Sequence, residues 1–61
     1  MNSIRPTNMK RIKEQLEMIR IAEKKINLAD DTEQDIVASL KIINKASFQA
    51  MQVVEQDIRE K

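Results

Sequence analysis

The hydrophobic positions of the chain fall into two long segments, and each has the spacing of an α-helix. In the first segment, hydrophobic side chains recur at steps of three and four residues: Met9, Ile12, Leu16, Ile19, Ala22 and Ile26. This spacing places them along one face of a helix. We therefore expect a first helix over about residues 8–27, with Met18 and Ile21 lying off its main hydrophobic stripe.

The second segment has a wider hydrophobic arc. One line consists of Ile36, Leu40 and Ile43, and further hydrophobic residues extend or flank it: Val37, Phe48, Met51, Val54 and Ile58. Lys41 and Lys45 are the only charged residues between positions 36 and 54. An arc this wide exceeds the contact surface of one neighbouring helix. We therefore expect a second helix, over about residues 32–59, that contacts more than one partner.

The polar stretch between the two segments contains both a helix stop and a helix start. Asn27 tolerates the left-handed conformation better than most residues, so we expect it at the end of the first helix in that conformation. Two pairs have the spacing of a capping box for the second helix. These pairs are Asp31 with Gln34 and Thr32 with Asp35. Either pair satisfies the free amides of the helix start.

Composition supports an all-α fold. The chain has no glycine and a single proline, Pro6, so neither helix breaker interrupts it after the start. No strand-length stretch alternates β-branched and polar residues. We predict one domain over residues 1–61: a flexible arm at 1–6, then an antiparallel two-helix hairpin with a turn at 28–31.

A chain of 61 residues has a small core and needs additional stabilisation. Disulfides and thiolate or imidazole metal sites are excluded because cysteine and histidine are absent. Association with another chain is the remaining way to stabilise so small a core. We therefore expect the hairpin to dimerise into a four-helix bundle, to bind a partner protein, or both. In the partner-bound version Phe48, Met51 and Val54 lie in a groove of the partner. The expected interface consists of Ile36, Leu40, Ile43, Phe48, Met51, Val54, Ile58, Leu16 and Ile19, with Leu40 central to the core.

The first residues allow two interpretations. Pro6 disfavours helical geometry at Arg5, and Thr7 or Asn8 then caps the first helix. Residues 1–6 are either a flexible tail or a docking peptide in which Ile4 and Arg5 make the contacts. Both interpretations fit the sequence pattern equally.

The sequence favours a binding protein over an enzyme. Its serines and threonines have no histidine, cysteine or tyrosine to work with, so no nucleophile–base pair is present. The acidic cluster of Asp30, Asp31, Glu33 and Asp35 is better explained by helix capping than by a metal site. We expect no cofactor, metal or small-molecule substrate. The absence of a long apolar run and of a signal-like N-terminus favours a cytoplasmic protein without membrane contact.

Nucleic-acid binding is the alternative function. The formal charge is only +1, but residues 1–29 contain seven basic and three acidic side chains. The basic residues concentrate at the start of the first helix: Arg5, Lys10, Arg11 and Lys13. Phosphate contacts use such side chains. A solvated helix face with ion pairs accounts for the same residues.

The start of the second helix resembles the Rop family of plasmid copy-number regulators. The residues that carry the resemblance are Asp31, Glu33, Gln34, Asp35, Ile36, Ser39 and Leu40. The resemblance implies a short helical hairpin that dimerises into a four-helix bundle and binds paired RNA loops. The segment 8–27 has no aromatic residue, whereas the RNA-binding face of that family uses one, so no functional residue carries over.

Overall fold

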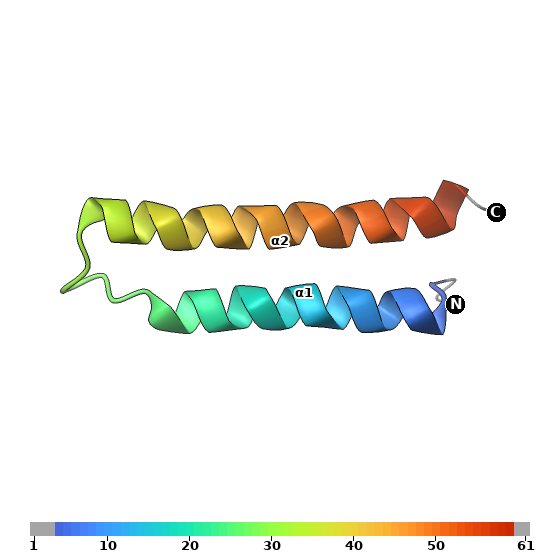
Figure 1. Cartoon of the computed structure of the whole chain (residues 1–61), viewed down its shortest axis with the longest axis horizontal. Helices are drawn as coiled ribbons and strands as arrows, with labels where there is room; N and C mark the ends of the chain where they lie inside the picture. Colours follow the sequence, from blue (N-terminus) through green and yellow to red (C-terminus); the bar gives the residue numbers. More distant parts are fainter. Residues whose placement is uncertain (1–3, 60–61) are drawn as a thin grey trace.

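The computed structural model describes residues 4–59, which form a hairpin of two antiparallel helices (Figure 1). Helix α1 spans Pro6–Lys25 and helix α2 spans Glu33–Arg59. The two helices pack against each other and make a rod of 46 × 16 × 15 Å. No strand occurs within the described residues. The predicted all-α hairpin is therefore confirmed.

The contact between the helices is a narrow seam whose residues follow steps of three and four. The seam positions are Asn8, Ile12, Gln15, Ile19 and Ala22 on α1, Ile26 directly after it, and Ile36, Ser39, Ile43, Ala46, Ala50, Val53 and Asp57 on α2. Ser47 and Val54 of α2 are also partly buried, beside this line. This is the heptad spacing of a coiled coil. Ala22 and Ala46 are only 4% and 1% exposed. Since alanine has a short side chain, the helices can approach closely at these two positions.

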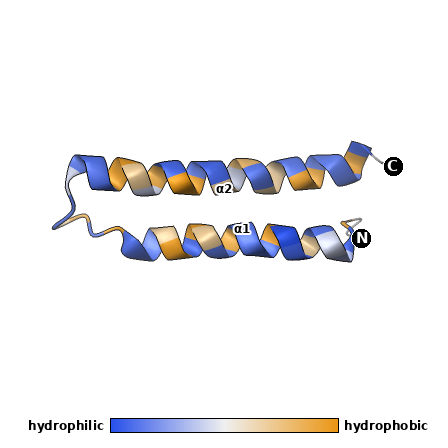
Figure 2. Cartoon of the chain, in the orientation of Figure 1, coloured by the Kyte–Doolittle hydropathy of each residue, from blue (hydrophilic) through white to orange (hydrophobic). Residues whose placement is uncertain are grey.

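The seam overlaps the predicted stripes but is rotated relative to them. Ile12, Ile19, Ala22 and Ile26 of the first predicted stripe lie in the seam, as do Ile36 and Ile43 of the second. On α1, Asn8 and Gln15 occupy seam positions, while Met9 and Leu16 are exposed. On α2, Leu40 is 50% exposed, so its predicted place at the centre of the core is wrong for the hairpin. Small and polar side chains are buried in preference to large ones. Figure 2 shows that hydrophobic residues occur along the length of both helices.

The start of α1 differs from the prediction. The helix begins at Pro6, whose fixed φ and missing amide suit the first helical position. Arg5 precedes it with an extended backbone and makes no capping bond through its own side chain. The predicted cap by Thr7 or Asn8 is wrong, because both residues lie inside the helix. Of the predicted arm, residues 1–3 lie outside the described residues.

The connection between the helices is longer than the predicted turn at 28–31. Helix α1 ends at Lys25, and Ile26 follows with an extended backbone of φ −72° and ψ 123°. No described residue has a positive φ, so the predicted left-handed Asn27 is wrong. Extended geometry at Ile26 already turns the chain away from the helix, which removes the need for a left-handed residue.

Asn27 instead organises the connection through hydrogen bonds. Its backbone amide donates to Asp31 Oδ2 at 2.9 Å, and its Nδ2 donates to Asp30 Oδ2 at 3.0 Å. Its Oδ1 accepts from the Ala29 amide at 3.1 Å, which is an Asx turn. Hydrogen bonds of Asn27 therefore shape the chain after α1, where a left-handed backbone at this residue was predicted.

Helix α2 begins with one of the two predicted capping boxes. The Asp35 amide donates to Thr32 Oγ1 at 3.2 Å, and the Thr32 amide donates to Asp35 Oδ2 at 3.4 Å. The predicted pair of Thr32 and Asp35 is confirmed. The other candidate, Asp31, accepts from Asn27 instead.

Candidate interaction surfaces

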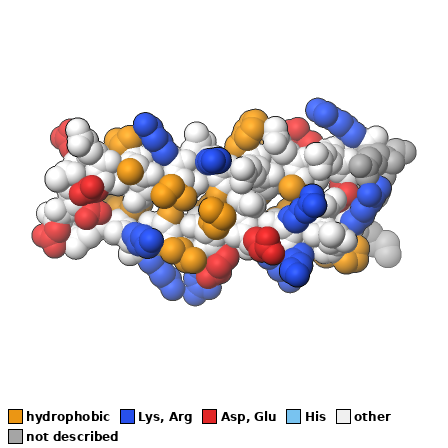
Figure 3. Space-filling view, in the orientation of Figure 1, with side chains coloured by type: hydrophobic (Ala, Val, Ile, Leu, Met, Phe, Trp, Pro, Cys, Tyr) orange, Lys and Arg blue, Asp and Glu red, His pale blue; other side chains and the backbone are white. Residues whose placement is uncertain are grey.

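Most of the large hydrophobic side chains lie outside the seam. Among the described residues, the exposed ones are Met9, Leu16, Met18, Ile21, Leu28, Val37, Leu40, Ile42, Phe48, Met51 and Ile58. No large side chain is fully buried in this part of the chain. Figure 3 shows hydrophobic side chains at the surface between and along the two helices. The hairpin therefore offers apolar surface for further contacts.

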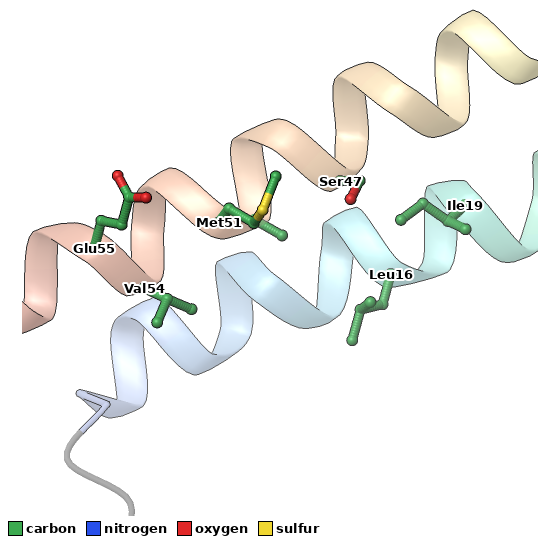
Figure 4. A pocket seen from close by; sticks show the side chains of 7 residues that line it. Leu16, Ile19, Ser47, Met51, Val54 and Glu55 are labelled. Carbon is green, nitrogen blue, oxygen red and sulfur yellow. The ribbon is translucent and has the colours of Figure 1, made fainter.

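One exposed surface runs along α2 beside Leu16, and we name it the Met51 face. It comprises Leu16, Leu40, Met51, Val54 and Ile58. A hollow of about 390 Å³ in this face is lined by residues of both helices. In Figure 4, Leu16 and Ile19 come from α1, whereas Ser47, Met51 and Val54 come from α2. Glu55 is the only charged residue in the lining.

A second exposed surface, the Met18 face, comprises Met18, Ile21, Lys25, Ile42 and Lys45. Met18 follows Leu16 by two positions, which turns it about 200° around the helix axis. Ile42 and Met51 on α2 are related by about half a turn in the same way. The two faces therefore lie on opposite sides of the seam.

The Met18 face contains two adjoining hollows of about 210 and 280 Å³. Met18 and Ile42 line both of them. Lys25 lines the first hollow and Lys45 lines the second. The chemistry of this face thus differs from that of the Met51 face.

The residues predicted as one interface divide between the seam and the surface. Ile19, Ile36 and Ile43 are partly buried at seam positions. The exposed members are Leu16, Leu40, Phe48, Met51 and Ile58, and Val54 is partly buried beside them. Phe48 lies one turn before Met51 at the edge of the Met51 face. The prediction did not distinguish contacts inside the hairpin from those available to a partner.

Asp57 is a structural site that the sequence analysis missed. It is 3% exposed, and its Oδ2 accepts from the Arg5 backbone amide at 3.0 Å. Its Oδ1 accepts from Asn8 Nδ2 at 2.7 Å and lies 3.6 Å from Arg5 Nε. Asp57 thereby caps the start of α1 from the other helix. Asp57 follows Ala50 and Val53 at the spacing of the seam. A carboxylate at such a position is the signal in the sequence that indicates a hydrogen bond to the other helix.

The acidic residues of the connection are occupied with hydrogen bonds. Asp30 and Asp31 accept from Asn27, and Asp35 accepts from Thr32. Figure 3 shows acidic side chains gathered at the loop end of the rod. Within residues 4–59, no three acidic, histidine or cysteine side chains are arranged to hold a metal ion. The observed geometry is that of loop and helix capping.

The basic residues at the start of α1 do not share one narrow face. Arg5 pairs with Asp57, and the Arg5 side chain remains 60% exposed. Arg11 and Lys13 are two positions apart, so they project about 160° from each other around α1. Lys10 lies between these directions and is exposed. Nucleic-acid binding by these four residues stays a prediction.

No helix in the described part of the chain combines the length and apolarity needed to cross a membrane. Neither protein-family models nor curated proteins nor solved structures give a match to the chain.

Proposed function

We propose that the chain is a small, non-enzymatic interaction protein that works by helix-bundle assembly. Two copies pack through their Met51 faces and form an antiparallel four-helix bundle. The observation that carries the proposal is the distribution of side-chain size. The hairpin buries alanine between its helices and leaves leucine, methionine and phenylalanine exposed. Folding of one chain alone removes little of its large apolar surface from water.

The exposed area of the hairpin supports the same conclusion. The chain exposes 5250 Å², whereas a compact monomer of this mass exposes about 4,100 Å². The excess of roughly 1,150 Å² is larger than the ~800 Å² that each partner contributes to a standard protein interface.

Helix α2 carries a second heptad line in addition to its seam. Its members follow steps of three and four over most of the helix: Val37, Leu40, Asn44, Ser47, Met51, Val54 and Ile58. A line of this kind is the pattern by which helices pair. Helix α1 leaves most large members of this line exposed, so another helix can pack on them. The exposed members are Val37, Leu40, Met51 and Ile58. Leu16 of α1 lies beside this line and widens the contact.

The polar residues in the second line favour one antiparallel register. When Leu40 of one copy lies opposite Met51 of the second copy, the two α2 helices overlap along their full length. Asn44 then lies opposite Ser47 of the second copy. A polar pair within an apolar line disfavours other registers, because they would bury these groups against hydrophobic side chains.

Light scattering after size exclusion tests the assembly. We expect twice the chain mass at micromolar concentration. The variant Met51→Glu places a charge in the Met51 face, and we expect it to halve the mass. Gln52→Glu is the matched control, because it adds the same charge at an adjacent exposed position. That control should retain the wild-type mass.

Two results would overturn self-association. One is a highly helical wild-type monomer at hundreds of micromolar. The other is a Met51→Glu variant with the wild-type mass. A poorly helical isolated chain that becomes helical only with another protein would replace self-association by partner binding.

A further inference from the structure

The Met18 face combines exposed apolar side chains with positive charge. Met18, Ile21 and Ile42 are each 48% exposed, although they are large hydrophobic residues. They surround the buried Ala22 and Ala46, which form the floor between the helices. Such a depression accepts apolar side chains from a partner.

The charges around the two hollows have one sign. Lys25 and Lys45 line them, and no acidic residue does. Glu14 lies one helical turn before Met18 and outside both hollows. Lysine can lay its carbon chain over apolar surface and keep its ammonium group in water. A ligand seated here meets apolar side chains at the centre and ammonium groups at the rim.

We propose that the Met18 face binds an amphipathic helix of a second protein whose apolar stripe is flanked by aspartate or glutamate. Two packed helices present a groove in which a third helix can lie, with side chains spaced by three and four residues filling the hollows. From Ser39 to Gln49 the hollows extend over about 15 Å, which is about three turns of a partner helix. Acidic flanks on the partner then lie near Lys25 and Lys45.

Charge argues against a second copy of this face as the occupant. A two-fold contact through the Met18 face would bring Lys25 and Lys45 of both copies together. Like charges brought together in an interface are costly. The hollow of the Met51 face, in contrast, is lined by one charged residue, Glu55. The two faces therefore suit different partners, and this inference goes beyond the proposed self-association.

A designed peptide provides the probe. It has about 18 residues, or about five turns, with leucines spaced by three and four and glutamates beside them. Its matched control carries lysine at each glutamate position. Binding to the full chain is measured by fluorescence anisotropy at low salt. We expect the acidic peptide to bind about tenfold or more tightly than the basic one, and the difference to shrink as salt increases.

Charge reversal in the protein gives the reciprocal test. The double variant Lys25→Glu with Lys45→Glu should lose about tenfold or more in affinity for the acidic peptide and gain affinity for the basic one. Both lysines are exposed, and circular dichroism checks that the variant stays helical. Met51→Glu, on the opposite face, should leave affinity for the acidic peptide unchanged. Light scattering on the same samples tests self-association separately.

Several outcomes would overturn the inference. Equal binding of both peptides would remove the charge complementarity. Loss of acidic-peptide binding in Met51→Glu, with none in the lysine variant, would move the site to the other face. Binding to vesicles of anionic phospholipid or to duplex RNA, without binding to the acidic peptide, would assign the face to a different class of ligand.

Discussion

The bond network of Asp57 allows a quantitative prediction about the open end of the hairpin. Replacing Asp57 by alanine removes the acceptor for the Arg5 amide and for Asn8 Nδ2. Hydrogen bonds to a charged group contribute about 1.5–3 kcal/mol each, and this site is only part-buried, so the lower value applies. The ion pair adds little, because the Arg5 side chain is 60% exposed.

Alanine also favours the helix more than aspartate does, by roughly 0.5 kcal/mol. The net loss expected for Asp57→Ala is therefore about 2–3 kcal/mol in the free energy of unfolding. A domain of this length has a total of about 3–9 kcal/mol. The variant should melt about 8–24 °C below the wild type, since 1 kcal/mol corresponds to about 4–8 °C in a small domain.

Urea and thermal unfolding, followed by circular dichroism, measure this loss. Amide hydrogen exchange at Arg5 should accelerate in the variant. Asp57→Asn keeps an acceptor oxygen without the charge, so it should fall between the wild type and Asp57→Ala. Gln56→Ala is the control for helix propensity at a neighbouring exposed position. A cycle with Asn8→Ala should give a coupling of about 0.5–3 kcal/mol. An Asp57→Ala variant within about 0.5 kcal/mol of the wild type, with unchanged Arg5 exchange, would show that Asp57 does not cap α1 in solution.

Four further substitutions, one of them with a control variant, probe the seam, the cap and the outer surface. Unfolding free energies are the measurement for the seam and the cap. Thr32→Ala should cost about 1 kcal/mol, because it removes the capping bond to Asp35, and an unchanged stability would contradict that cap. Ala46→Leu should cost about 1–3 kcal/mol by overpacking the seam, whereas Ala38→Leu at an exposed position should not. Gln15→Leu should stabilise by about 1 kcal/mol, because the buried Gln15 Oε1 has no hydrogen-bond partner among the described residues. Leu40→Ala should weaken self-association, measured as a shift of the monomer–dimer equilibrium, more than it weakens the hairpin itself, because Leu40 is half exposed.

Local features of the chain were predictable from its sequence. The helical spacing and the absence of glycine indicate two long helices, and the Thr32–Asp35 pair marks the start of α2. The end of α1 was less predictable. Asn27 can act through its backbone or through its side chain, and its bonds to Asp30 and Asp31 decide between them. Whether Asn27 ends the helix through its backbone or its side chain depends on where the folded loop places the carboxylates of Asp30 and Asp31.

The surfaces were predicted less well, because α2 has two lines with heptad spacing. Ile43 belongs to the line that packs on α1, and Met51 belongs to the line that stays outside. Helical periodicity is the same for both lines, so it cannot tell them apart. The predicted line of Ile36, Leu40 and Ile43 takes members from both lines, and for that reason it placed Leu40 in the core.

Helical spacing and turn chemistry are local properties, so the two helices, their capped connection and the wide apolar surface of α2 can be inferred from the residues alone. Which face of each helix is buried depends on how the two helices pack. Ala22 and Ala46 are small enough to lie in the seam, whereas the larger Leu40 and Met51 stay exposed. It also joined Asn8 to Asp57, which are 49 positions apart. A hydrogen bond over that distance depends on the antiparallel register, which no local pattern contains.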